Sequence, residues 1–375
     1  MKKIFALAVF TCALTAAGLG FASDQTDNKE SIKIALIAPM SGSVASFGEI
    51  SANAVKSSAK NINDKGGILG RQINIEIIDD ACDPKQAVTV ANKIIADKIK
   101  FVVGASCSGA TLATKQAFSN EDILMLSSFA SNPAIADGKQ PNIFRVWSSD
   151  EEEAGLDAKY IAGHYDTKGG VAIIDDKQTY SESIANLLAK DLVEKNIKVV
   201  MHEKINAGEK DFSSVMTRVM DAKPSLLFYS GYQVEAGLIV RQLRDAGSQM
   251  PIMAATTISA PDFFSIAGEY GNGVKFASVP LPEDVSGSEK LTQLIKSKKI
   301  PSDSAGLYAY ITMEILADAM NKAGSLDPQK VGDVLHHQKL STIVGDGQFD
   351  SKGGYVGPPE QVYEWRNGKV TKATQ

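Results

Sequence analysis

The feature that most constrains this chain is a strand–helix–strand pattern in its first third, with a cysteine after each strand. The apolar runs Ile73–Ile78 and Phe101–Ala105 have strand length, and the amphipathic segment Pro84–Ile99 has the length of a helix of about four turns. Because the carboxyl ends of parallel strands meet at one edge of a sheet, Cys82 and Cys107 are able to meet there. Ligands of open α/β sheets bind at that edge. The pattern therefore predicts a small-molecule binding edge that is closed by a disulfide.

The first 22 residues are typical of a signal peptide. Lys2 and Lys3 precede the apolar stretch Ile4–Leu19, and Gly20–Ala22 supplies small residues where a signal peptidase cleaves. About 16 apolar residues are fewer than the roughly 20 that span a bilayer, which disfavours a membrane anchor. We therefore expect cleavage after Ala22 and a periplasmic location.

Export has consequences for charge and for the cysteines. The formal charge of −5 becomes −7 once Lys2 and Lys3 are removed, and an acidic surface predicts no binding to nucleic acid or anionic lipid. Of the three cysteines, Cys82 and Cys107 remain, in an oxidising compartment. A disulfide between them would stabilise the fold by roughly 3–4 kcal/mol on the chain-entropy model.

A chain of 375 residues favours two domains. In the first half, strand-like and helix-like segments alternate, which predicts βαβ units and a parallel sheet. The expected strands are Ile32–Met40, Ile73–Ile78, Phe101–Ala105, Ile123–Leu126 and Phe144–Trp147, with helices over Ile50–Asn63, Pro84–Ile99 and Gly109–Asn120.

A second alternation follows, and the chain then becomes rich in helix. Its expected strands are Val171–Asp175, Val199–Ile205, Leu226–Ser230, Ile252–Ala255 and Val274–Val279, with helices over Glu151–His164, Ser181–Glu194, Phe212–Met220 and Val234–Ala246. The last part is expected to hold helices over Ser288–Lys298, Ser304–Ala323 and Pro328–His337, and strands over Gly347–Asp350 and Val362–Trp365.

The common motifs of enzymes are missing from this sequence. It contains no phosphate-binding G-x-x-x-x-G-K-[ST] loop, no G-x-G-x-x-G between strand and helix, and no G-x-S-x-G turn. None of the four histidines lies near a Ser or Cys suited to nucleophilic chemistry. The acid pairs Asp79–Asp80 and Asp175–Asp176 suit either Mg²⁺ or helix capping, and we favour capping. We expect a protein that is not an enzyme and that needs no cofactor.

Several polar and aromatic residues follow predicted strands and suggest a binding cleft. Ser108 and Ser131 each place a hydroxyl where a helix is expected to begin, which suits a carboxylate, although plain helix capping is the alternative. Phe47, Tyr180 and Tyr232 also follow strands, where aromatic rings more often pack than contact a ligand. Five such residues at carboxyl edges favour a site.

At these residues the chain resembles the leucine/isoleucine/valine-binding proteins, which are exported receptors of ATP-binding-cassette (ABC) amino-acid importers. The likeness extends from about Ser31 to Lys369. Its most specific motifs are DDACDPKQAVTVANK (79–93), GASCSGAT (104–111), INAGEKDFSSV (205–215) and YSGYQVEAG (229–237). The resemblance implies the α/β fold of type I periplasmic binding proteins: two doubly wound parallel-sheet lobes joined by three hinge crossings, with the ligand trapped by hinge closure.

This resemblance also implies where the lobes and the site lie. Lobe one would comprise 31–149 and 278–357, and lobe two 150–277 and 358–375. Cys82 and Cys107 would form the family disulfide. The ligand's carboxylate and ammonium would be held by Ser108, Ser131 and main-chain groups of Phe129 from lobe one. Phe47 would stand in place of the family's Tyr, Tyr180 and Tyr232 would close from lobe two, and Trp147 with Leu307–Tyr308 would shape the side-chain pocket.

One departure from the family pattern concerns the ligand's ammonium group. Where the family has a carboxylate that pairs with this group, the chain has Thr256–Thr257. Either another acid, Asp262 or Glu235, reaches the site, or the ligand is not a simple α-amino acid.

Together these features predict a monomeric periplasmic receptor that binds a branched-chain or aliphatic amino acid and delivers it to ABC permease subunits. The alternatives are an amine-free carboxylate or amide as ligand, and a sensor subunit that signals through a membrane receptor.

Overall fold

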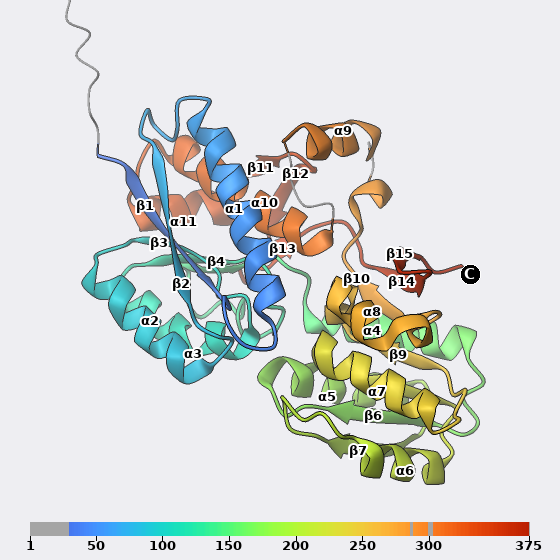
Figure 1. Ribbon diagram of the computed structural model, residues 1–375. Coiled ribbons are helices and arrows are strands. Elements are labelled where there is room, and N and C mark those ends of the chain that lie inside the picture. The colour runs from blue at the N-terminus through green and yellow to red at the C-terminus, as the bar shows by residue number, and fades with distance from the viewer. Residues whose placement is uncertain (1–29, 286–287, 299–302, 375) are drawn as a thin grey trace, which may run out of the picture.

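The computed structural model describes residues 30–285, 288–298 and 303–374, which form two α/β lobes side by side (Figure 1). The expected signal peptide, residues 1–22, lies outside the described residues. Within the described ranges, no helix combines the length and the hydrophobicity that a membrane span requires.

The sheet of the first lobe has five parallel strands in the order β2-β1-β3-β4-β5. Its interior strand β1 is buried except at Lys33, because helices cover both faces of the sheet. Helices α2 and α3 pack on one face, and α1, α10 and α11 pack on the other. These elements are β1 (Ile32–Ala38), β2 (Ile73–Asp79), β3 (Phe101–Val103), β4 (Leu124–Ser127), β5 (Ile143–Arg145), α1 (Ala45–Asn63), α2 (Pro84–Ala96), α3 (Ser108–Asn120), α10 (Ser304–Ala323) and α11 (Pro328–His337).

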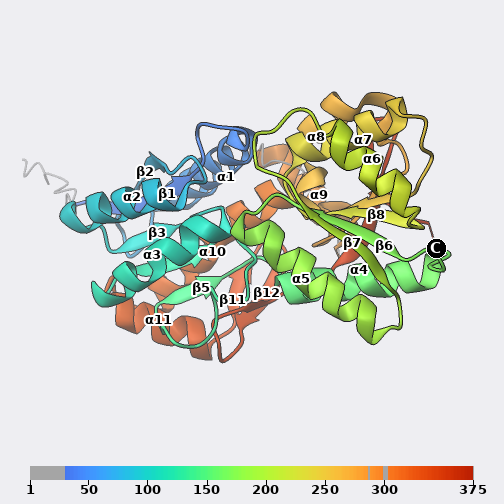
Figure 2. The ribbon, with the colours of Figure 1, turned by 90° about the horizontal axis from the view of Figure 1, so that it is seen from below.

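The second lobe is built on a seven-stranded sheet in the order β15-β14-β10-β9-β8-β6-β7. Five strands are parallel, and the chain returns near its end to add β14 and β15 antiparallel at one edge (Figure 1). Helices α4 and α5 cover one face, and α6, α7 and α8 cover the other (Figure 2). These elements are β6 (Val171–Asp175), β7 (Val199–Lys204), β8 (Leu226–Tyr229), β9 (Ile252–Ala254), β10 (Lys275–Ser278), β14 (Gln361–Arg366), β15 (Lys369–Lys372), α4 (Asp150–His164), α5 (Thr179–Glu194), α6 (Ser213–Ala222), α7 (Gln233–Asp245) and α8 (Pro261–Ala267).

Smaller elements complete the structure. A three-stranded antiparallel sheet of β11 (Leu340–Thr342), β12 (Gly345–Phe349) and β13 (Tyr355–Val356) packs beside α10 and α11. The remaining elements are α9 (Ser288–Lys298) and three short 3₁₀ helices, η1 (Thr256–Ser259), η2 (Gly268–Gly271) and η3 (Pro282–Asp284). Strands β11, β13 and β15 were not predicted, because two to four residues are too few for a periodic pattern.

The chain passes between the lobes three times, after β5, after β10 and after β13 (Figure 1). The first crossing ends at Ser149, whose side chain accepts the N–H of Glu151 at 3.3 Å while the carboxylate of Glu152 accepts the N–H of Ser149 at 3.3 Å. This capping box fixes the start of α4 directly after the crossing. The predicted arrangement of two parallel-sheet lobes with three crossings is confirmed.

The acid pairs after β2 and β6 do not cap the following helices, contrary to the prediction. All four carboxylates instead accept the main-chain N–H two residues further on, at distances of 2.8–3.1 Å. Asx turns of this kind are a common role of Asp after a strand. The N-terminus of α2 is capped by Asp83, and Gln178 stands at that position in α5 without a side-chain cap. The described residues also contain no cluster of three or more His, Cys, Asp or Glu side chains arranged to hold a metal ion.

Candidate functional site

A narrow cavity lies where the two lobes meet, and both lobes contribute to its wall. The described residues that line it carry hydroxyls, rings and aliphatic groups, and none carries a full charge at neutral pH. They are Pro39, Val44, Phe47, Ser106, Cys107, Ser108, Phe129, Ala130 and Ser131 from the first lobe and Tyr180, Tyr232, Thr256 and Thr257 from the second.

The start of α3 faces this cavity. Ser108 is the first residue of α3, is buried, and accepts the N–H of Asn132 on its Oγ at 3.3 Å. Its neighbours Ser106 and Cys107 also line the cavity. The first N–H groups of a helix have no partner within the helix, and the helix dipole adds positive partial charge there. This end of the cavity therefore suits an anionic group such as a carboxylate.

Ser131 lines the cavity and also connects it to the second lobe. No helix begins at Ser131, contrary to the prediction, because Pro133 disfavours the helical region at the preceding residue and turns follow. The carbonyl oxygen of Ser131 accepts the N–H of Asp150 at 3.0 Å and a guanidinium N–H of Arg145 at 3.3 Å. Asp150 is the first residue of α4. The cavity wall is thus hydrogen-bonded to the start of a second-lobe helix.

A row of aromatic rings forms the apolar part of the first-lobe wall. The rings of Phe47 and Phe129 line the cavity with centroids 4.8 Å apart. Trp147 does not line the cavity; its ring packs edge-on behind Phe129 at 4.6 Å and against Tyr308 at 5.0 Å. Tyr308 borders a separate hollow near the crossings. Trp147 and Tyr308 therefore affect the cavity only through the position of Phe129.

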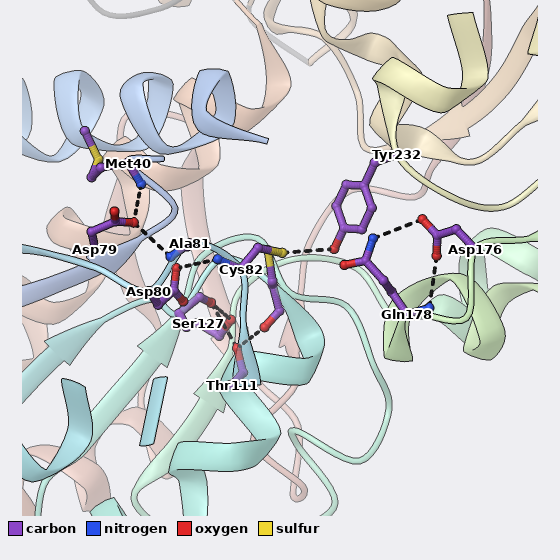
Figure 3. Close-up of a disulfide and its surroundings, with 12 residues drawn as sticks. Met40, Asp79, Asp80, Ala81, Cys82, Thr111, Ser127, Asp176, Gln178 and Tyr232 are labelled. Carbon is purple, nitrogen blue, oxygen red and sulfur yellow. Dashed lines mark hydrogen bonds between the residues drawn. A yellow bond between two sulfur atoms is a disulfide. The ribbon is translucent and has the colours of Figure 1, made fainter. Parts of the chain in front are cut away.

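Two tyrosines from the second lobe complete the wall. Tyr180 lies in the first turn of α5, Tyr232 directly precedes α7, and their ring centroids are 5.6 Å apart. Burial raises the pKa of both phenols, so both remain neutral hydroxyls. The hydroxyl of Tyr232 lies 3.6 Å from the Sγ of Cys82, which brings the two lobes into contact beside the cavity (Figure 3).

Cys82 and Cys107 form a disulfide, as predicted, with their Cα atoms 5.5 Å apart. It joins the loop after β2 to the loop after β3, and Cys107 directly precedes Ser108. The disulfide therefore holds in place the start of α3 that faces the cavity.

The segment after β9 supplies Thr256 and Thr257. Thr256 Oγ1 donates to Ser278 Oγ at 2.8 Å, and Thr257 Oγ1 donates to the carbonyl oxygen of Gly231 at 2.6 Å. Both hydroxyl donors are thus engaged by other parts of the second lobe. The N–H of Thr256 donates to the carboxylate of Glu153 at 2.7 Å.

Glu153 is the acid that accepts this hydrogen bond from the wall, and it was missed in the sequence. Asp262 and Glu235 do not line the cavity, and Glu235 accepts the N–H of Gly208 at 2.7 Å instead. In the sequence, Glu153 belongs to a run of acids that looks like the solvated first turn of a helix. Only the structure separates the exposed Glu151 from the buried Glu153. The hydrogen bond to Thr256 is the feature that identifies Glu153 as a candidate residue of the site.

Comparison with known proteins decides the family. The family model described as "Periplasmic binding protein" matches residues 31–369. The chain is 35% identical over 350 residues to the leucine-, isoleucine-, valine-, threonine-, and alanine-binding protein of Pseudomonas aeruginosa, covering 92% of each chain. The chain belongs to the periplasmic binding protein family.

Solved structures agree with this fold of periplasmic binding proteins. The leucine-binding protein of Thermotoga maritima superimposes with a TM-score of 0.82 at 22% identity, covering 92% of this chain and 98% of that one. A solute-binding protein of R. palustris in complex with benzoate also has a TM-score of 0.82, at 17% identity, covering 91% and 95%. These identities support the shared fold, and the type I periplasmic binding protein architecture predicted from the sequence is confirmed.

Proposed function

We propose that this chain is the exported solute receptor of an ABC importer and that it binds a small amino acid with an aliphatic side chain between its lobes. The observation that carries this proposal is the cavity itself, which has one hydroxyl-rich end, one aromatic side and walls from both lobes.

The proposed contacts follow from the chemistry of the wall. Ser108, Ser131 and the start of α3 receive the carboxylate, together with main-chain groups of Phe129. The side chain of the ligand packs against Phe47 and Phe129. Tyr180 and Tyr232 close over the ligand from the second lobe when the three crossings flex. The relative from Pseudomonas aeruginosa is named for aliphatic amino acids and threonine, which supports this choice.

A second candidate is an amine-free carboxylate, and the uncharged cavity lining favours it. Burying an ammonium without a counter-charge costs several kcal/mol. A cation–π contact with Tyr180 or Tyr232 returns only about 0.5–2 kcal/mol, and a micromolar complex has only about −8 kcal/mol in total. The neighbour from R. palustris holds benzoate. The choice between the two candidates depends on whether a carboxylate just behind the cavity wall pairs with the ligand's ammonium group.

The proposal is tested by identifying the ligand directly. Native mass spectrometry of the exported protein, purified without unfolding, should detect one bound solute of amino-acid mass. After the solute is stripped, calorimetry should show that leucine, isoleucine, valine or alanine binds more tightly than 4-methylpentanoate, leucinamide or benzoate. Tighter binding of the amine-free acids would replace the amino acid by the second candidate. No binding by any of them would reject the proposed function.

The partners and the location belong to the same proposal. We place the mature protein in the periplasm as a monomer that docks on the permease subunits of its importer. The alternative, a sensor subunit for a membrane receptor, requires the same cavity and the same closure. Reconstitution with the permease and ATPase separates them: uptake that depends on this protein supports transport, and a protein that binds solute but stimulates no uptake supports sensing.

A further inference from the structure

The cavity wall has hydrogen-bonding groups for a carboxylate but no charged residue for an ammonium. We infer that Glu153, from α4, supplies the counter-charge for the ligand's ammonium group that Thr256 cannot supply. This inference rests on the proposed function and makes it more specific, since it restricts the ligand to solutes that carry a cationic amine.

Glu153 contacts the cavity wall at two points. Its Oε1 accepts the N–H of Thr256 at 2.7 Å and the hydroxyl of Tyr180 at 3.4 Å. Both partners line the cavity. The carboxylate therefore lies directly behind the part of the wall where the missing acid was expected.

The other oxygen of this carboxylate is unused. Glu153 is only 1% exposed, and its Oε2 has no hydrogen-bond partner among the described residues. The charged groups that act on it are all acidic: Glu360 from the third crossing, and Asp157 and Asp150 from α4. A buried carboxylate that lacks a cation is costly unless a ligand supplies one. A ligand ammonium would satisfy both Oε2 and the local excess of negative charge.

The carboxylate end of the site and Glu153 are connected through the first turn of α4. Ser131, on the carboxylate side, accepts the N–H of Asp150 at 3.0 Å. Glu153 follows Asp150 by three residues on α4, so the two residues lie at neighbouring positions of one helix face. Helix α4 therefore holds Glu153 in a fixed relation to the proposed carboxylate contacts.

The protonation of Glu153 provides an independent readout. Burial, followed by the nearby charges of Glu360 and Asp157, raises its pKa well above the usual range in the empty protein. An ammonium beside it would lower that pKa again. Binding an amino acid should therefore release a proton, and affinity should increase as pH rises towards the pKa of the empty protein. Tyr180 also faces the carboxylate, but its own raised pKa keeps it neutral throughout.

The experiment compares leucine with 4-methylpentanoate, which lacks only the amine, in wild-type protein and in Glu153→Gln. Glutamine keeps the shape and the acceptor for Thr256, so thermal melting should show a folded variant. Leucine should bind the variant about 10- to 100-fold more weakly, the usual effect of losing a hydrogen bond to a charged group. The affinity for 4-methylpentanoate should change by less than about threefold, because it never contacts the lost charge.

Asp157→Asn is the matched control, since Asp157 is an equally buried acid one turn further along α4 and has no hydrogen bond to a cavity-lining residue in the described part of the chain. This variant should not weaken leucine binding. Calorimetry in buffers of different ionisation enthalpy should detect proton release with leucine in wild type and none in Glu153→Gln.

The possible failures can be told apart. If Glu153→Gln keeps both the preference for leucine and the proton release, the role of Glu153 is wrong and the proposed function stands. If wild-type protein prefers 4-methylpentanoate, both the amino-acid ligand and the role of Glu153 are wrong. Should Glu153→Gln not fold, the wild-type measurement alone decides, because leucine binding without proton release would reject the inference.

Discussion

Ser131 contributes both its hydroxyl and its main chain to the region around the cavity, and the two contributions are separable by substitution. Ser131→Ala removes only the hydroxyl and leaves the carbonyl that accepts from Asp150. We expect ligand binding to weaken by about 1–3 kcal/mol, because a buried polar group of the ligand would lose its partner. Titration calorimetry measures the change.

Ser128 provides the control for Ser131. It is a buried serine three residues earlier, its hydroxyl has no partner among the described residues, and it does not line the cavity. Ser128→Ala should leave affinity unchanged. An affinity for Ser131→Ala equal to that of this control would remove Ser131 from the site.

The buried carboxyl of Asp80 makes the stability of the fold depend on pH. It is fully buried, and burial raises its pKa from 3.8 to about 6. The folded state therefore binds the proton more tightly than the unfolded chain, so this group's contribution to stability falls as pH rises from about 4 to about 6 and then levels off.

Asp80→Asn should stabilise the fold at neutral pH. The amide keeps an oxygen for the N–H of Cys82 and removes the buried charge, so we expect a gain of about 1–3 kcal/mol at pH 7. Urea unfolding measures it, and the gain should nearly vanish at pH 4, where the wild-type carboxyl is protonated. An equal gain at both pH values would contradict this explanation.

At the scale of elements, the disulfide joins two loops that carry the cavity wall. Its half-cystines are 25 residues apart, so the double substitution Cys82→Ser and Cys107→Ser should reduce the free energy of unfolding by roughly 3–4 kcal/mol. Denaturant unfolding of the variant gives this value. Wild-type protein treated with a reductant should become as unstable as the variant, and a reductant without effect would show that the bond does not contribute.

Helix α4 depends on its capping box, and it also carries Glu153. Ser149→Ala removes the side-chain acceptor at the helix start and should cost about 0.5–2 kcal/mol of stability. Because Glu153 lies in the first turn of α4, we also expect weaker amino-acid binding. Urea unfolding measures the loss, and a variant as stable as wild-type protein would show that the capping box does not contribute to stability.

For the whole molecule, the prediction concerns closure of the lobes. The contact between Cys82 and Tyr232 and the hydrogen bond from Gln233 to Ser46 at 3.4 Å both join the two lobes beside the cavity. A ligand held by both walls should favour the arrangement in which these contacts form. Small-angle scattering should detect a smaller radius of gyration at saturating ligand, and ligand at 100 times its dissociation constant should add about 2.7 kcal/mol of stability. An unchanged radius would contradict closure.

Much of the fold could be predicted from local pattern. The strand β6 and the helices α9, α10 and α11 have the predicted bounds, since their apolar periodicity and flanking turn residues are clear. The short strands β11 and β13 and the edge strand β15 could not, although each pairs with the strand next to it in the chain, because two to four residues are too few for a periodic pattern. At Ser131 the strand is followed by a turn rather than the expected helix.

The sequence by itself determined the alternation of strands and helices, the side of each sheet where polar residues gather, and the pair of cysteines, because these depend on periodicity and on strand direction. Only the tertiary structure decided which acid lies behind Thr256. Glu153 comes from a helix more than a hundred residues earlier, and its neighbours in the sequence give no sign that it is buried. Contacts between distant segments depend on how two sheets and their helices pack, and no local pattern encodes that packing.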